Sequence, residues 1–132
     1  MAFDILVVDD EDDIRMLIAD ILSDEGFECR TAKDSSSALA AIEDRRPNLL
    51  ILDIWLEGSE LDGMEILQRV QQDYSAIPVV IISGHGNVET AVNAIKLGAY
   101  DFIEKPFKAD RLVLTATRAI EAARLQRENE EL

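Results

Sequence analysis

The sequence predicts an α/β fold: a doubly wound parallel sheet of five strands with helices packed on both of its faces. Apolar runs of strand length alternate five times with segments in which apolar residues recur at helical spacing. Strands that alternate with helices pair in parallel through right-handed crossovers, which produces a doubly wound sheet. The chain has 132 residues, of which 48% are apolar, so we expect one domain with a substantial core.

The five predicted strands differ in polarity, and this difference orders them in the sheet. Three are apolar runs suited to central positions, at residues 4–8, 49–53 and 78–82. Two carry polar residues and suit the edges, at residues 28–31 and 100–104. The order 2-1-3-4-5 satisfies these preferences. This flavodoxin-like (βα)5 arrangement puts the topological switch point, where ligands bind in open α/β sheets, between strands one and three.

Helices are predicted between the strands and after the last one. The first contains the periodic residues 14–22, and the others cover residues 34–44, 63–73, 87–97 and 108–132; Gly26 and Gly98 are expected to end the first and fourth. The apolar spacing predicts buried stripes on the first helix (Ile14, Leu17, Ile18, Ile21, Leu22) and on the fourth (Val88, Ala91, Val92, Ile95). Asn87 is the expected N-cap of the fourth helix.

Charge and composition exclude several classes of function. The formal net charge of -14 and a pI near 4.3 argue against direct binding to nucleic acid or to an anionic membrane. No apolar run approaches the roughly 20 residues of a membrane span, and no signal segment is present. The single cysteine, Cys29, excludes an internal disulfide framework. We therefore expect a cytoplasmic protein.

Polar residues with complementary chemistry stand at the carboxyl ends of four predicted strands. Asp9 and Asp10 follow the first strand, Asp53 ends the third, Ser83 follows the fourth, and Lys105 follows the fifth. Three carboxylates at one sheet edge repel one another unless a cation lies among them, and Mg²⁺ is a hard cation that prefers oxygen ligands. A metal, a hydroxyl and an ammonium group around one carboxylate can stabilise a transferred phosphoryl group.

These motifs resemble the receiver domains of two-component response regulators along nearly the whole chain. They are Val7-Val8-Asp9-Asp10-Glu11, Leu52-Asp53, Ile82-Ser83-Gly84 and Lys105-Pro106-Phe107. The resemblance implies that Asp53 accepts a phosphoryl group from a sensor histidine kinase. It also implies a Mg²⁺ ion held by Asp9, Asp10, Asp53 and the backbone carbonyl of Trp55.

The same resemblance implies a conformational switch. Ser83 corresponds to the switch hydroxyl and Lys105 to the phosphate-contacting lysine, whose bond to Pro106 is cis in the family. Phe102 corresponds to the switch aromatic, which would change its packing as Ser83 moves toward the phosphoryl group. The alternative is that Phe102 is a partly buried edge-strand side chain without a switching role.

Three positions near Asp53 depart from the common family pattern. The loop that leads to Gly63 is long and acidic, and it has Glu57 where the family commonly has proline. Trp55 and His85 lie two residues after Asp53 and Ser83, at positions that often tune the lifetime of the aspartyl phosphate in the family. We expect the bulky Trp55 to slow hydrolysis. The roles of His85 and of the loop from Glu57 to Asp62 stay open.

The last predicted helix extends beyond its buried positions. We therefore assign residues 1–123 to the receiver domain and 124–132 to the start of a helical linker. Together with the loop after Asp53 and the stretch from His85 to Phe107, this tail resembles the nitrogen-regulation group of NtrX/NtrC-type sigma-54 activators. That resemblance implies an NtrY/NtrB-like kinase, AAA+ and DNA-binding modules beyond this chain, and a possible homodimer through helix four, strand five and helix five.

Three other functions compete with the phosphoacceptor. An FMN carrier needs a phosphate-binding loop after the first strand, but that loop is acidic. A Mg²⁺-dependent phosphohydrolase would usually carry its nucleophile on the first strand and a substrate-binding cap. A pseudo-receiver that acts only through protein contacts is disfavoured by the complete set of Asp9, Asp10, Asp53, Ser83 and Lys105.

Overall fold

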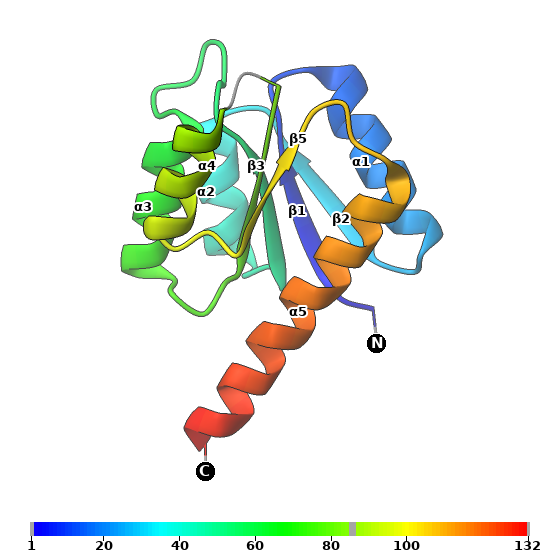
Figure 1. Ribbon diagram of the computed structural model, residues 1–132, viewed down its shortest axis with the longest axis vertical. Helices are drawn as coiled ribbons and strands as arrows, with labels where there is room; N and C mark the ends of the chain where they lie inside the picture. Colours follow the sequence, from blue (N-terminus) through cyan, green and yellow to red (C-terminus); the bar gives the residue numbers. More distant parts are fainter. Residues whose placement is uncertain (1, 85–86, 132) are drawn as a thin grey trace.

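The predicted topology is present in the computed structural model, which describes residues 2–84 and 87–131 of the chain. One five-stranded sheet has the order β2-β1-β3-β4-β5, and all of its neighbouring strands pair in parallel. The strands are β1 (Asp4–Val8), β2 (Glu28–Ala32), β3 (Leu49–Asp53), β4 (Val79–Ser83) and β5 (Asp101–Glu104). Figure 1 shows the strands running side by side between two layers of helices.

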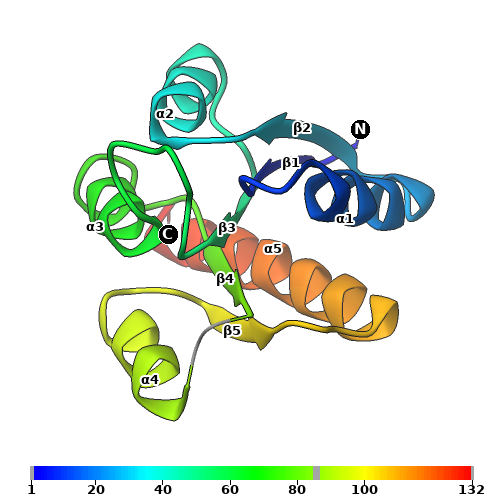
Figure 2. The same ribbon diagram turned by 90° about the horizontal axis from the view of Figure 1, so that it is seen from above.

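The helices divide between the two faces of the sheet. They are α1 (Asp12–Asp24), α2 (Ser35–Asp44), α3 (Gly63–Asp73), α4 (Val88–Lys96) and α5 (Ala109–Glu131). Figure 2 shows α1 and α5 on one side of the sheet and α2, α3 and α4 on the other. Side chains of β3 alternate accordingly: Leu50 and Leu52 join the core under α2 and α3, and Leu49 and Ile51 join the core under α1 and α5.

Local signals set most of the helix boundaries. Asp34 and Asp62 accept backbone hydrogen bonds from the third residue of α2 and of α3, and both helices begin with a complete capping box. Asn87 caps α4 through the backbone N–H of Thr90, as predicted. Gly26 and Gly98 follow the ends of α1 and α4, also as predicted.

The predicted buried stripe of α4 is wrong. Val88, Val92 and Ile95 are 81%, 45% and 46% exposed, and Ala94 is the residue of α4 that is fully buried. The reason lies in the sheet order: α4 covers the edge strand β5, so only a narrow side of the helix meets the sheet (Figure 2). Leu17 of α1 was also expected inside but is 49% exposed, because Ile18 and Leu22 fill the contact with the sheet.

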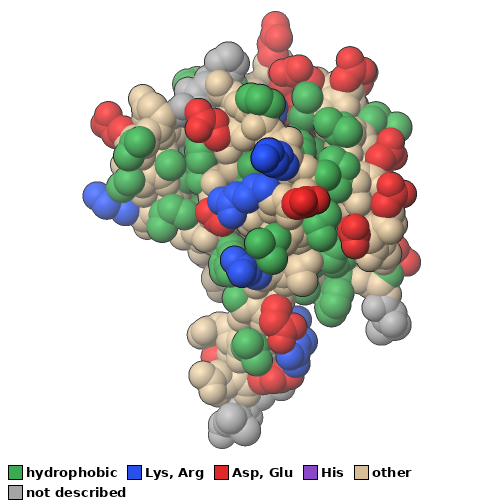
Figure 3. Space-filling model, turned by 45° about the vertical axis from the view of Figure 1, so that its right-hand side comes forward, with side chains coloured by type: hydrophobic (Ala, Val, Ile, Leu, Met, Phe, Trp, Pro, Cys, Tyr) green, Lys and Arg blue, Asp and Glu red, His purple; other side chains and the backbone are tan. Residues whose placement is uncertain are grey.

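Helix α5 is longer than the sheet that it covers. Its buried positions run from Leu112 to Ile120, and the remaining turns leave the domain (Figure 1). Among the described residues, no helix is both long enough and apolar enough to span a bilayer. The face drawn in Figure 3 carries acidic side chains along its margin and a few basic ones near its centre, in keeping with the formal net charge of -14.

Candidate functional site

The three predicted carboxylates converge at the carboxyl edge of the sheet. Asp9 follows β1 and Asp53 ends β3, and these two strands are neighbours with Val8 opposite Leu52. One carboxylate oxygen from each of Asp9, Asp10 and Asp53 lies within 4.8 Å of the other two. Asp9 and Asp53 are buried and Asp10 is half-buried. The strand order therefore creates a compact group of oxygen ligands.

Lys105 supplies the positive charge at this edge. It follows β5, and its Nζ lies 3.0 Å from Oδ2 of Asp9 and 3.3 Å from Oδ2 of Asp53. Its backbone N–H donates to the carbonyl of Ser83, which holds the end of β5 against the end of β4. The Lys105–Pro106 bond is cis, as the family resemblance implied. One ammonium group therefore pairs with two of the three carboxylates, and the cluster of Asp9, Asp10, Asp53 and Lys105 has more negative than positive groups.

Burial and charge set the protonation of the group. Burial raises the pKa of Asp53 to about 6; Lys105 opposes this rise, and Asp9 and Asp10 add to it. Burial works against the charge of Lys105, but its hydrogen bonds to Asp9 and Asp53 and their negative charges outweigh burial and raise the pKa of Lys105. Near neutral pH, Asp53 is therefore mostly an ionised carboxylate beside a protonated lysine.

The donor set fits a hard divalent cation. All three ligands are carboxylate oxygens, and a buried excess of negative charge is costly unless a cation compensates it. Backbone groups already orient two of the ligands: Glu11 N–H donates to Oδ1 of Asp9 over 2.9 Å, and Glu57 N–H donates to Oδ2 of Asp10 over 3.1 Å. Asp9, Asp10 and Asp53 can therefore hold a metal ion.

A cavity of about 450 Å³ opens above the carboxylates. Its walls include Trp55, Glu57 and Asp62 from the loop after β3 and Gly84 from the loop after β4. Trp55 is 55% exposed, so its indole forms a rim of the cavity without closing it. A small anionic group can reach Asp53 here, provided that positive charge offsets the acidic walls.

The two predicted switch residues lie outside the walls of this cavity, and only Ser83 is at the same end of the sheet. Ser83 is the last residue of β4 and is completely buried, beside Glu104 of β5. Phe102 lies farther back on β5, opposite Ile81, and packs half-buried against the core under α2, α3 and α4. The prediction for His85 falls outside the described residues.

Sequence reasoning missed the close approach of α3 to Asp53. A Cβ atom on Gly63 would lie 2.1 Å from the carbonyl oxygen of Asp53 and 2.6 Å from Cα of Ile54. The Gly63 N–H donates to the Ile54 carbonyl over 2.7 Å. Glycine is therefore required where α3 meets the end of β3. The signal was a glycine at the first helical position directly after the Asp62 cap.

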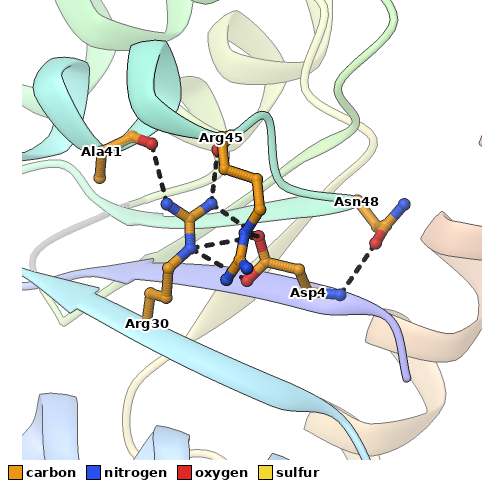
Figure 4. A network of polar contacts seen from close by, with 5 residues as sticks. All are labelled: Asp4, Arg30, Ala41, Arg45 and Asn48. Carbon is orange, nitrogen blue, oxygen red and sulfur yellow. Dashed lines mark hydrogen bonds and ion pairs between the residues drawn. The ribbon is translucent and has the colours of Figure 1, made fainter. Parts of the chain in front are cut away.

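Another buried carboxylate, Asp4, lies at the amino end of β1, at the opposite end of the strands from the candidate site. Arg30 of β2 donates to both of its oxygens, with its Nη2 2.6 Å from Oδ2, and Arg45 Nε lies 3.4 Å from Oδ2 (Figure 4). Arg30 also donates to the carbonyls of Ala41 and Arg45, and the Asp4 backbone N–H donates to Asn48 (Figure 4). These contacts join β1, β2 and the end of α2 in one network.

Comparisons with known proteins agree with this geometry. Residues 5–117 match the model of the response regulator receiver domain. The chain is 63% identical over 132 residues to the nitrogen assimilation regulatory protein NtrX of Azorhizobium caulinodans, across 100% of this chain and 29% of that protein. It is 35% identical over 114 residues to the DNA-binding transcriptional regulator NtrC of Salmonella typhimurium, across 86% of this chain and 24% of that protein.

Solved structures show the same relationship. Crystal structures of NtrX from Brucella abortus include one that matches with a TM-score of 0.94 at 65% identity, over 99% of this chain and 29% of that one. The receiver domain of the same Brucella protein matches with a TM-score of 0.87 at 68% identity, over 89% of this chain and 98% of that one. The chain thus spans less than a third of the length of its full-length relatives. It belongs to the receiver domains of response regulators, and among them to the NtrX/NtrC type.

Proposed function

We propose that this domain accepts a phosphoryl group on Asp53 from the phosphohistidine of a sensor kinase. An Asp53 carboxylate oxygen attacks phosphorus, the P–O bond forms as the P–N bond breaks, and the histidine nitrogen leaves with the bonding electron pair. The observation that carries this proposal is the position of Asp53 beneath an open cavity, with two more carboxylates within 4.8 Å and Lys105 Nζ at 3.3 Å. The domain is a signalling domain rather than a classical enzyme.

The residues of the site divide the work of the transfer. Asp9, Asp10 and Asp53, with the carbonyl of Trp55, would hold Mg²⁺, which supplies positive charge to the transferring phosphoryl oxygens. Lys105 stands between Asp9 and Asp53 and can move its ammonium group onto a new phosphoryl oxygen. Ser83 provides a hydroxyl for a second oxygen. Trp55 at the rim limits the approach of water to the product.

The proposal also covers how phosphorylation would be signalled to other parts of the longer protein. Movement of Ser83 toward the phosphoryl group changes the packing of Phe102, and residues 124–132 form the start of a linker from the receiver domain of residues 1–123. The partners would be an NtrY/NtrB-like kinase and the AAA+ and DNA-binding modules of the longer protein. The exposed stripe of α4 (Val88, Val92, Ile95) supports a homodimer through α4, β5 and α5.

The deciding experiment is the intact mass of the protein after incubation with Mg²⁺ and a small acyl phosphate. We expect one added phosphoryl group, which disappears in Asp53→Asn and in a chelated sample. Metal binding without an adduct from either the acyl phosphate or a phosphorylated kinase would contradict phosphotransfer. Absence of both metal binding and adduct would favour a pseudo-receiver that acts only through protein contacts.

A further inference from the structure

The loop between β3 and α3 contains a tight turn next to the carboxylate group. The Ser59 N–H donates to the Leu56 carbonyl over 3.2 Å, which closes a four-residue turn with Glu57 and Gly58 at its centre. Gly58 has a φ of 75°, and Glu57 has an ordinary negative φ. This combination is that of a type II turn, whose third position favours glycine. Leu56, at the start of the turn, is buried in the core.

Two serines fasten this turn to the start of α2. The Ser35 N–H donates to Oγ of Ser59 over 2.9 Å, and Ser59 Oγ donates to the Leu61 carbonyl over 2.6 Å. The Leu61 N–H donates in turn to Oγ of Ser35 over 3.2 Å. Ser35 is only 3% exposed, so water competes little for these bonds. We call Ser35, Ser59 and Leu61 the serine clasp.

The clasped turn presents one backbone donor to the candidate metal site. The N–H of Glu57 donates to Oδ2 of Asp10 over 3.1 Å, across 47 positions in sequence. Asp10 is half-buried, while the Asp9 side chain accepts from the nearby Glu11 N–H and pairs with Lys105 from the end of β5. Among the described residues, the turn therefore supplies the hydrogen bond that orients the Asp10 side chain.

We propose that the turn Leu56–Ser59, held by the serine clasp, positions Asp10 for the cation. The Glu57 N–H holds one Asp10 oxygen and leaves the other directed at the ion, so Glu57 acts through its backbone and Ser59 through the turn. Hydrogen bonds to a metal ligand fix its orientation, and losing them typically costs about 10-fold or more in metal affinity. The inference rests on the proposed function, because it assumes that Asp10 binds Mg²⁺.

The sharpest test removes the donor without removing the turn. Proline is favoured at the second position of a type II turn and has no N–H, so Glu57→Pro deletes the bond to Asp10 and keeps the turn geometry. Glu57→Ala is the matched control, since it also removes the carboxylate but keeps the N–H. Calorimetric titration should give a Mg²⁺ affinity for Glu57→Pro about 10-fold below that of Glu57→Ala.

A second metal separates positioning from a general loss of charge or structure. Mg²⁺ demands a nearly regular octahedral site, whereas Ca²⁺ tolerates irregular geometry. We expect Glu57→Pro to lose more Mg²⁺ affinity than Ca²⁺ affinity relative to Glu57→Ala. Equal Mg²⁺ affinity of the two variants, or an equal loss for both ions, would overturn the inference.

A variant without any change of charge provides an independent check. Ser59→Ala breaks two bonds of the clasp, and Ser36→Ala at the exposed neighbouring position serves as its control. We expect a several-fold weaker Mg²⁺ affinity in Ser59→Ala and none of this loss in Ser36→Ala. Wild-type affinity in Ser59→Ala would show that the clasp does not position the site. If the wild-type protein itself bound no Mg²⁺, the proposed function would fail first.

Discussion

Asp4 and Asp53 are buried carboxylates at opposite ends of the strands, Asp4 at the start of β1 and Asp53 at the end of β3. They differ in how much positive charge lies around them. Both side chains are almost inaccessible, at 10% and 7% exposed. Asp4 contacts two arginines, and one of them is bidentate. Asp53 shares one lysine with Asp9 and stands beside Asp10. Burial alone therefore does not mark a functional carboxylate, whereas an uncompensated group of them in a cavity does.

The largest expected change in stability comes from removing the arginine that compensates the buried charge of Asp4. Arg30→Ala should destabilise the domain by about 3 kcal/mol, because it leaves Asp4 buried with little compensation. Urea denaturation measures this loss. Arg45→Ala is the control, since Arg45 is 59% exposed and its ion pair is worth less than about 1 kcal/mol. Equal losses in the two variants would mean that the bidentate pair has no special weight.

Neutralising Asp53, at the other end of the strands, should stabilise the domain instead of destabilising it. The pKa of Asp53 is about 6 in the folded protein, against an ordinary value of 3.8, so its contribution is fully present below pH 4 and is lost as the pH rises through 6. Without metal at pH 7, Asp53→Asn should therefore be more stable than the wild type by about 2 kcal/mol, which is the roughly 3 kcal/mol of the full pKa shift reduced for screening by solvent in the open cavity. Denaturation at pH 4 and pH 7 tests this, and a variant no more stable at pH 7 than at pH 4 relative to wild type would contradict it.

The stabilisation by added Mg²⁺ should depend on the carboxylates around Asp53 and not on the network around Asp4. Mg²⁺ at ten times its Kd should stabilise the wild type by about 1.4 kcal/mol, since it binds the folded state. Asp10→Asn should lose most of this gain, and Arg45→Ala should keep all of it. A thermal melt with and without the ion measures both. A Mg²⁺ gain that persists in Asp10→Asn would place the cation elsewhere on the molecule.

The smallest expected effect is on the rate at which water hydrolyses the phosphoryl group on Asp53. Trp55 forms part of the cavity rim above Asp53, so Trp55→Asn should shorten the lifetime of the aspartyl phosphate a few-fold. Loss of the adduct over time, followed by intact mass, gives the rate. Trp55→Phe is the matched control because it keeps an aromatic ring at the rim. An unchanged decay in Trp55→Asn would show that the indole does not obstruct water.

The sheet and its acidic edge followed from short-range patterns. The contrast between apolar strands and polar edge strands gave the order 2-1-3-4-5, and that order brought Asp9 and Asp53 together. The exposed stripe of α4 could not be predicted in this way, because helical spacing reveals an apolar face but not whether a neighbour covers it. That outcome depends on α4 lying over an edge strand.

Contacts made by backbone groups were the other part that the sequence concealed. The bond from the Glu57 N–H to Asp10 joins positions far apart in the chain, and the non-proline residue at position 57 permits the bond but does not reveal its partner. Gly63 was visible as a glycine, but the need for it comes from the Asp53 carbonyl, which would lie 2.1 Å from a Cβ atom. Side-chain chemistry was therefore more predictable than the backbone that orients it.

Helix α5 extends well beyond the part of it that packs on the sheet. The helix continues without a break past Ile120, its last buried residue, to Glu131. Those final turns extend about 16 Å at 1.5 Å per residue. A tilt of about 20° where the helix leaves the sheet would carry its tip through about 6 Å. Any rearrangement beside the sheet that tilted α5 would therefore produce a larger displacement at the end of the helix than at the sheet.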